Sequence, residues 1–281
     1  MSALIFSLVF WLCALALNVR LANSAYRDAR IVRIIVPLLF GVTLLVLWEG
    51  LVRGFNVSPV ILPAPSAVAQ TFAASTEILW EDFQQTVFKG ALTGFAIGSM
   101  TAFLTAIAID RSTFLTRGLL PIGNFVAALP IVGIAPILVS WFGFDWQSKA
   151  AVVVVMVFFP ILVNTVQGLR ETDAMQRDLM RTYAASYLQT LVKLRLPAAM
   201  PFVFNGLKIA TTLALIGAIV AEYFGSPTRG MGFRISTGVG SLSIDLVWAE
   251  IAVAALAGTV FYSLVAWIEK TVTFWHPSQR G

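Results

Sequence analysis

Seven long apolar runs constrain the fold of this sequence more than any other feature. Each approaches the roughly 20 apolar residues that a helix needs to cross the hydrocarbon core of a bilayer. Runs of this length indicate transmembrane helices rather than the short alternating strands of a membrane barrel. The runs cover residues 3–19, 33–52, 86–109, 118–141, 149–169, 205–223 and 247–269. The sequence therefore predicts an all-α, polytopic membrane protein with about seven transmembrane helices.

The composition excludes a soluble enzyme and a disordered chain. Of the 281 residues, 58% are hydrophobic and 12% are charged, which is about half the charged fraction of an ordinary soluble domain. One cysteine, Cys13, excludes a disulfide framework. One histidine, His276, argues against a histidine metal centre or a Ser-His-Asp triad. We therefore predict no catalytic residues and no metal site.

Lysine and arginine residues are distributed unevenly between the two sides of the predicted spans. With the N-terminus outside, the cytoplasmic segments hold 14 of them and the opposite side holds 5. This bias follows the positive-inside rule. It predicts a C-terminus in the cytoplasm.

The first apolar run has two interpretations, a retained transmembrane helix or a cleaved signal peptide. The first three residues, Met1-Ser2-Ala3, carry no positive charge, and the charges follow the run, which is the wrong order for a signal peptide. We expect a retained helix. Residues 1–30 would then be an extra N-terminal transmembrane helix with a basic cytoplasmic loop. Residues 31–281 would form the main membrane domain.

Several motifs of catalysis and ion coupling are missing from the sequence. There is no G-x-x-x-x-G-K-[ST] loop, so the chain is not expected to hydrolyse ATP. A membrane enzyme would need clustered His, Asp and Glu residues, and an ion-coupled secondary transporter would need a charged residue in mid-membrane. The acidic residues of the predicted spans all lie near span ends: Glu49, Glu222, Glu250 and Glu269. A secondary transporter remains the alternative function.

An amphipathic segment lies in the polar loop of residues 170–204. Seven residues recur at the spacing of one helical face: Leu179, Met180, Tyr183, Ala184, Tyr187, Leu188 and Leu191. We expect Pro197 to end this helix, because proline cannot continue the hydrogen-bond ladder. The pattern allows two interpretations. The helix either lies on lipid headgroups or docks onto another protein.

The spacing in this loop resembles the cytoplasmic signature of the permease subunits of ABC importers. That signature is E-A-A, three residues, Gly, nine residues, then Ile-x-Leu-Pro. The corresponding residues here are Asp178-Leu179-Met180, then Ala184, then Leu194-Arg195-Leu196-Pro197. The spacing matches throughout, and the final Leu-Pro is identical. This resemblance favours the docking interpretation.

Other segments resemble one branch of that family, the nitrate/sulfonate/taurine-type permeases. These segments are Leu47-Trp48-Glu49, Leu62-Pro63-Ala64-Pro65-Ser66, Trp141-Phe142-Gly143-Phe144, Ser148-Lys149, Ala221-Glu222-Tyr223-Phe224-Gly225 and Gly230-Met231-Gly232-Phe233. The runs 179–186 and 230–236 look more like permeases assigned to pyrimidine or vitamin-precursor uptake. The resemblance extends from about Trp48 to Trp267.

The resemblance implies a type I ABC importer permease fold that works by alternating access in a bacterial inner membrane. It implies a second permease copy, giving a homodimer, and an extracytoplasmic substrate-binding protein. Two separate ATPase subunits would bind the ATP and magnesium, so the chain itself needs no cofactor. No nucleic-acid partner is expected.

The resemblance also implies roles for individual residues of the loop. Leu179, Met180, Tyr183 and Tyr187 would be buried in a groove of the ATPase, since aromatic anchors are frequent hot spots of interfaces. Ala184 would have to stay small to allow close approach. Leu196-Pro197 would fix the end of the helix. Asp178, Arg177 and Arg181 would pair with charges on the ATPase.

The predicted span at 118–141 is the candidate for the translocation pathway. Its proline residues, among them Pro121, Pro130 and Pro136, interrupt the helical hydrogen bonds, and broken helices tend to line a cavity. Trp141 and Glu222 are further candidates for the pathway or its gate, although Trp141 also fits an interfacial aromatic belt and Glu222 a structural salt bridge. In the preceding span, Gly90-x3-Gly94-x3-Gly98 predicts a close-packing face for another helix.

Overall fold

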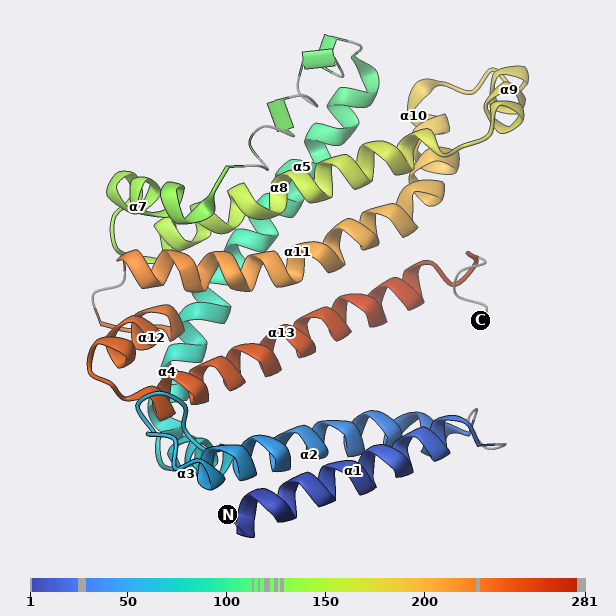
Figure 1. The fold of residues 1–281 in the computed structure, drawn as a ribbon. Coiled ribbons are helices and arrows are strands. Elements are labelled where there is room, and N and C mark those ends of the chain that lie inside the picture. The colour runs from blue at the N-terminus through green and yellow to red at the C-terminus, as the bar shows by residue number, and fades with distance from the viewer. Residues whose placement is uncertain are drawn as a thin grey trace. The chain divides into compact units, whose positions relative to one another are not determined.

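The computed structural model describes residues 2–24, 29–112, 114–115, 117–118, 122–123, 126, 129–225 and 228–276. Every regular element among these residues is a helix (Figure 1). Six of the described helices are long and apolar enough to cross a membrane. The prediction of a polytopic helical membrane protein is therefore confirmed.

The described elements have the following bounds along the chain. They are α1 (Ser2–Ala22), α2 (Arg30–Gly54), α3 (Pro65–Ala74), α4 (Thr76–Phe83), η1 (Gln84–Leu92), α5 (Thr93–Arg111), α7 (Ile131–Phe142), α8 (Trp146–Arg170), α9 (Ala174–Thr182), α10 (Tyr187–Thr190), η2 (Leu191–Arg195), α11 (Leu196–Gly225), α12 (Met231–Gly240) and α13 (Ile244–Val272). The predicted span at 118–141 contributes α7, whose 12 residues are too few to cross a bilayer alone. Pro121 lies outside the described residues.

Two of the long helices extend further than the apolar runs predicted. One is continuous from Thr76 to Arg111 and includes the π-helical segment η1, and the other is continuous from Tyr187 to Gly225 and includes the π-helical segment η2. The expectation that Pro197 ends a helix is therefore wrong. η2 ends two residues before Pro197, and a π-helical turn shifts the hydrogen-bond pattern, so the missing N–H and the ring of proline are accommodated there.

The chain forms two compact units. The first comprises Met1–Leu79 and Thr237–Glu250, and the second comprises Trp80–Ser236 and Ile251–Gly281. From the sequence we predict a boundary between residues 30 and 31, which separates an additional N-terminal helix from the main membrane domain. This boundary stays a prediction.

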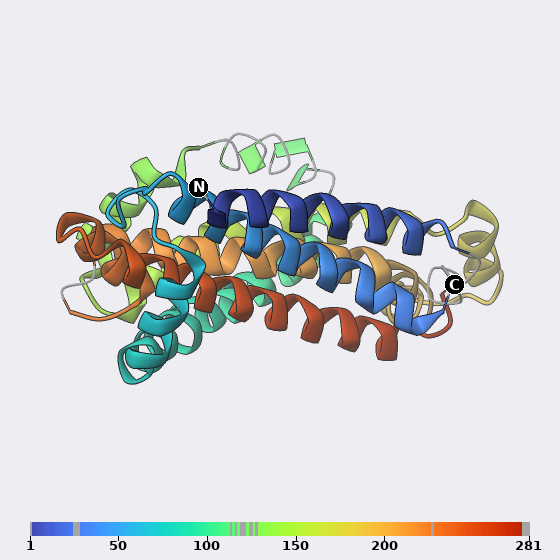
Figure 2. The same cartoon turned by 60° about the horizontal axis from the view of Figure 1, so that its bottom comes forward.

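In the first unit, α1 and α2 lie side by side in both views (Figures 1 and 2). The end of α2 is joined to the start of α3 by Glu49, whose carboxylate accepts hydrogen bonds from the Ser66 backbone N–H at 3.0 Å and the Ser66 hydroxyl at 2.7 Å. Pro65, the first residue of α3, has no backbone N–H that needs an acceptor. The next backbone N–H, that of Ser66, finds its acceptor in Glu49. Two of the segments that carry the family resemblance are thus held together by this contact.

In the second unit, α8 packs against both α5 and α11. The contact with α5 depends on the absence of side chains on α5. A Cβ atom on Gly94 would lie 2.8 Å from the backbone carbonyl oxygen of Ala150, and one on Gly98 would lie 3.3 Å from the Cα of Val154. The predicted packing role of this glycine stripe is therefore confirmed.

We predict that Gly94→Ala will destabilise the protein by about 1–3 kcal/mol, the usual cost of overpacking, because the backbone of α8 has to move. Thermal unfolding of the detergent-solubilised protein measures the change. Gly133→Ala in α7 is the control, since a Cβ there would meet nothing closer than 4.0 Å. An unchanged melting temperature for Gly94→Ala would show that α5 and α8 are less tightly packed than described.

Candidate functional site

The polar segment that follows α8 folds into two short helices, α9 and α10, rather than one. Each begins with a capping box, in which a side chain and a backbone group at the helix start satisfy each other. Asp173 pairs in this way with Gln176 at the start of α9, and Ser186 pairs with Gln189 at the start of α10. The prediction of one continuous amphipathic helix through residues 179–191 is therefore wrong, because a second helix start interrupts it.

The break between the two helices is made at Ala184. Its φ angle is 51°, in the left-handed region that alanine rarely adopts. Its N–H donates to the carbonyl of Arg181 at 2.8 Å, and the Ala185 N–H donates to the carbonyl of Met180 at 3.0 Å, which together close the end of α9. The family signature has glycine at this position, and the structure gives a backbone reason for it. The close approach of a partner at Ala184 stays a prediction.

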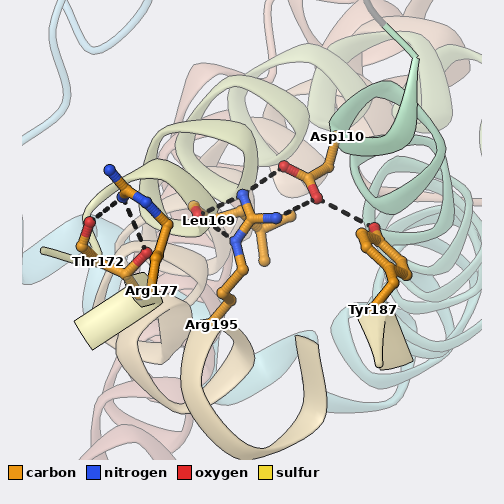
Figure 3. Close-up of polar contacts among 6 residues, drawn as sticks. All are labelled: Asp110, Leu169, Thr172, Arg177, Tyr187 and Arg195. Atoms are coloured by element: carbon orange, nitrogen blue, oxygen red, sulfur yellow. Dashed lines mark hydrogen bonds and ion pairs between the residues drawn. The ribbon is translucent and has the colours of Figure 1, made fainter. Parts of the chain in front are cut away.

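A buried ion pair attaches this segment to the ends of two long helices (Figure 3). Arg195 donates to both carboxylate oxygens of Asp110, at 2.5 and 2.6 Å, and to the carbonyl of Leu169 at 2.8 and 3.0 Å. Tyr187 donates its hydroxyl hydrogen to the same carboxylate at 3.0 Å. Only 7% of the Asp110 side chain and 17% of the Arg195 side chain are exposed. We call these four residues the Asp110–Arg195 cluster.

Large apolar side chains remain exposed on the surface of α9 and α10. The side chain of Met175 is 82% exposed and that of Tyr183 is 76% exposed, and Leu179 and Leu188 are also exposed. Tyr187, which the helical pattern grouped with Leu179 and Tyr183, is half-buried and bonded to Asp110 instead. Of the predicted anchors, Leu179 and Tyr183 thus face outward, whereas Tyr187 fastens the segment to the rest of the protein.

The remaining predicted residues of this segment have less distinctive surroundings. Asp178 and Arg181 form an exposed ion pair at 3.2 Å within α9, a kind of contact that contributes little stability. Arg177 donates instead to the backbone carbonyl and hydroxyl of Thr172 (Figure 3). The other predicted residues of this segment are half-buried: Met180, Leu194, Leu196 and Pro197.

The three pathway candidates in the 118–141 run all belong to α7 or its start. Pro130 is the residue before the first helical residue, where its restricted φ angle fits, and Pro136 lies inside α7. Trp141 lies in the last turn and is 74% exposed. Their role in the pathway stays a prediction.

Glu222, the fourth candidate, is fully buried near the end of α11. Its carboxylate accepts hydrogen bonds from the Thr86 hydroxyl at 2.7 Å and the Gly232 N–H at 3.1 Å. Thr86 in turn accepts from the Met231 N–H at 2.8 Å, and Asp82 accepts from the Gly230 N–H at 2.6 Å. In this conformation Glu222 is held by protein groups rather than open to a solute, and a gating role stays a prediction.

These contacts hold the start of α12 in place, because three successive backbone N–H groups there donate to side chains of other helices. Arg234 adds an ion pair with Asp82 at 2.8 Å. We call Asp82, Thr86, Glu222 and Arg234 the Asp82–Glu222 cluster. Carboxylates near a helix N-terminus are favourable because they complement its partial positive charge.

A buried lysine brings further segments of the family resemblance together at this end. Lys149 has no exposed surface, and its ammonium group donates to the carbonyl of Phe144 and, at 2.6 Å, to the carbonyl of Gly225. Phe144 follows Gly143, whose φ angle of 83° makes a sharp turn after α7. The start of α8, the turn after α7 and the end of α11 are thereby joined.

The two clusters lie at opposite ends of the same long helices. Asp82 and Asp110 share the helix Thr76–Arg111, and the rise of 1.5 Å per residue places them roughly 40 Å apart. Arg195 and Glu222 are separated by a similar length of the helix Tyr187–Gly225. This distance matches a bilayer with its headgroup regions, which is about 40–45 Å thick. Apolar spans with a polar cluster at each end define a multi-pass membrane protein, and exposed apolar side chains lie beyond one of these clusters.

Comparison with known proteins identifies the family. Residues 94–274 match the family described as binding-protein-dependent transport system inner membrane component. The chain belongs to this family, the permease subunits of ABC importers, and is a multi-pass protein of the inner membrane. The recognition made from the loop spacing and the flanking segments is therefore confirmed.

Relatives with assigned names agree with this membership. The chain is 33% identical to a probable ABC transporter permease protein of Haemophilus influenzae, with 84% of this chain and 96% of the relative covered. It is 29% identical to the formylaminopyrimidine transport permease protein ThiX of Halalkalibacterium halodurans, covering 86% and 96% of the two chains. It is also 29% identical to a putative aliphatic sulfonates transport permease protein of Bacillus subtilis, covering 87% and 88%.

Several residues that the structure makes prominent were given no role from the sequence. Asp110 and Arg195 form the buried pair, and the only signal for them was an acid at the end of one apolar run and the variable position before Leu196-Pro197. Asp82 and Thr86 lie outside every motif, and Arg234 belongs only to the run 230–236. Met175 is an exposed apolar residue outside the helical pattern, which did include the exposed Leu188. The capping boxes at Asp173 and Ser186 were a readable signal for the two-helix arrangement, and they would have placed Leu188 at the start of a second helix.

We predict that Ala184→Gly will raise the free energy of unfolding by up to about 1 kcal/mol, the cost of a left-handed alanine. Ala184→Val should lower it, because a β-branched side chain is more strained at positive φ. Thermal unfolding in detergent tests both variants. Ala185→Gly is the control, because this neighbour is not at positive φ and gains nothing from glycine. If Ala184→Gly and Ala185→Gly lower stability equally, the left-handed assignment is wrong.

We predict that Asp110→Ala will destabilise the protein by about 3 kcal/mol, the usual loss when one partner of a buried ion pair is removed. The double variant Asp110→Ala/Arg195→Leu should lose less than the sum of the single variants, because it leaves no buried charge unpaired. Thermal unfolding of the four proteins gives the coupling energy. Arg181→Ala, which breaks only the exposed pair with Asp178, should change stability by less than about 1 kcal/mol. Additive effects of the Asp110 and Arg195 changes would contradict the buried pair.

Proposed function

We propose that this chain is the permease subunit of an ATP-driven importer in which α9 and α10 dock onto a separate ATPase subunit. The complex contains two permease copies, two ATPase subunits that bind ATP and magnesium, and an extracytoplasmic binding protein that delivers the solute. The N-terminus lies outside and the C-terminus in the cytoplasm. The exposed apolar side chains on α9 and α10 are the observation that carries this proposal.

The position of these side chains supports a protein partner rather than lipid. They lie beyond the Asp110–Arg195 cluster, at the end of α8, in a segment where polar and charged residues alternate with them. Four exposed apolar residues in such a polar segment are unfavourable in water and favour burial against another protein. Met175, Leu179 and Tyr183 are large enough to fill pockets of a partner, which is the usual form of an interface hot spot.

The attachment of this segment supports the transmission of movement. α10 continues through η2 into α11 as one helix, and Arg195 holds the start of that helix to Asp110 of α5 and to the last turn of α8. A displacement of α9 and α10 by the ATPase would therefore act on the ends of three membrane helices together. In an alternating-access mechanism, such a displacement changes which side of the membrane the solute path faces.

The relatives support a small solute. One is named for formylaminopyrimidine and another for aliphatic sulfonates. A small organic molecule of one of these kinds is our proposed substrate class, with its selectivity set largely by the binding protein. The ligand bound by that binding protein identifies the solute.

We predict that Leu179→Ala/Tyr183→Ala will weaken association with the ATPase at least 30-fold, the equivalent of about 2 kcal/mol for a hot-spot pair. Co-purification of the ATPase with the tagged permease and titration of the purified subunits measure the change. Trp267→Ala in α13 is the control, since it removes an equally exposed aromatic side chain from a predicted span. Retained association of the double variant, with the control behaving alike, would refute the docking role of α9.

A further inference from the structure

One face of α8 and α11 carries polar side chains where membrane helices are normally apolar. Asn205 of α11 is exposed and donates its side-chain N–H to the side-chain oxygen of Asn164 in α8 at 3.0 Å. Asn164 in turn donates to the carbonyl of Pro160 at 2.8 Å. Gln167, one turn further along α8 from Asn164, is also exposed. We call Asn164, Gln167 and Asn205 the polar track.

The depth of the Asn164–Asn205 pair makes contact with lipid unfavourable. Asn164 precedes Leu169, whose carbonyl belongs to the Asp110–Arg195 cluster, by roughly 8 Å of helix, and Asn205 follows Arg195 by roughly 15 Å. Both amides are therefore displaced from that polar level toward the apolar middle of their helices. Polar side chains inside a membrane face the protein interior or a water-filled cavity, because hydrocarbon offers them no hydrogen-bond partners.

Two cavities lie along α8, and their lining residues follow one another along this helix, up to Pro160 for the first and from Val163 for the second. The first has a volume of about 200 Å³, and Met156, Pro160 and Leu213 are among its lining residues. The second has a volume of about 350 Å³ and is lined by Val163, Val166, Gln167, Arg170 and Glu171. Gln167 of the polar track thus lines the second cavity itself, and Asn164 directly follows Val163, another of its lining residues.

Pro160 adds a backbone acceptor to the first cavity. Proline has no N–H to donate to the carbonyl four residues earlier, which is that of Met156. In a membrane, a freed carbonyl is tolerated where neighbouring groups or water can bond to it. Met156 and Pro160 both line this cavity. The freed carbonyl of Met156 therefore lies before the amides of Asn164 and Gln167 along α8.

We propose that the polar track and the two cavities form this subunit's wall of the solute path, with Asn164 and Asn205 as the groups that hydrogen-bond the passing solute. This inference rests on the proposed transport function and names the residues that would carry it. The described wall holds neutral amides and reaches charged groups, Arg170 and Glu171, only at its end. It therefore fits a small polar solute that is handed on by hydrogen bonds rather than held by a fixed charge.

Water access to introduced cysteines tests this proposal without a known solute. The chain has one native cysteine, Cys13, so Cys13→Ser gives a cysteine-free background. Asn205→Cys and Gln167→Cys are made in it, with Leu264→Cys of α13 as the control, because Leu264 is 52% exposed on an apolar stretch of α13. Membrane vesicles carrying the full transporter are treated with a charged methanethiosulfonate reagent, with and without ATP.

We expect Asn205→Cys and Gln167→Cys to react at least 10-fold faster than Leu264→Cys in one of the two nucleotide conditions, because the nucleophile that attacks the reagent is a thiolate, which forms only where the cysteine is hydrated. Labelling of each denatured variant with N-ethylmaleimide verifies that its cysteine is present and free. Equal rates for all three positions, or a spontaneous disulfide between two copies through Asn205→Cys without reaction with the reagent, would overturn the proposal. The reactivity of these cysteines does not depend on α9. The solute-path proposal can therefore fail while the docking proposal is upheld, and the docking proposal can fail while the solute-path proposal is upheld.

Discussion

The buried pair between Asp110 and Arg195 is the interaction on which the arrangement of α9 and α10 depends. It joins the end of α5 to the start of α11, and the same guanidinium reaches the last turn of α8. Two charges with so little exposed surface are stable only when their hydrogen bonds are satisfied, and here both carboxylate oxygens and three guanidinium nitrogens are engaged. Tyr187 then fastens α10 to the same carboxylate, so the exposed residues around it are presented from a fixed base.

Buried polar side chains also join neighbouring segments at the opposite end of the second unit, where they bond mainly to backbone groups. There the acceptors are Asp82, Thr86 and Glu222, and the donors are backbone N–H groups of residues 230–232. A side chain on Gly230 would collide with the carboxylate of Glu222, so the absence of one is required. Three segments of the second unit that resembled the family in sequence meet at this end, Ser148-Lys149, residues 221–225 and residues 230–233, and each contacts another of them.

The spans and the family were predictable from the sequence because both depend on local signals. Apolar run length predicted the long helices, and signature spacing in the loop pointed to the family. The errors arose where a longer-range or finer signal decided the outcome. The helical periodicity of residues 179–191 continues across Ala184, although the backbone reverses there, and Pro197 looked like a helix end because the π-helical turn before it has no sequence signature. The partner of Arg195 is 85 residues away, so no local pattern could have paired it with Asp110.

The irregularities of the helix Tyr187–Gly225 are all gathered near its beginning. The π-helical segment, Pro197 and Pro201 fall within residues 191–201, and no proline follows them before Gly225. Backbone hydrogen bonds are weakest in that stretch, so bending is easiest there and the rest of the helix moves as a stiff arm. Over an arm of roughly 30 Å, the length from Pro201 to Glu222 at about 1.5 Å per residue, a tilt of about 5° displaces the far end by roughly 3 Å. That displacement is as long as a hydrogen bond, so a small tilt at one membrane surface is enough to separate Glu222 from Thr86 and Gly232 at the other.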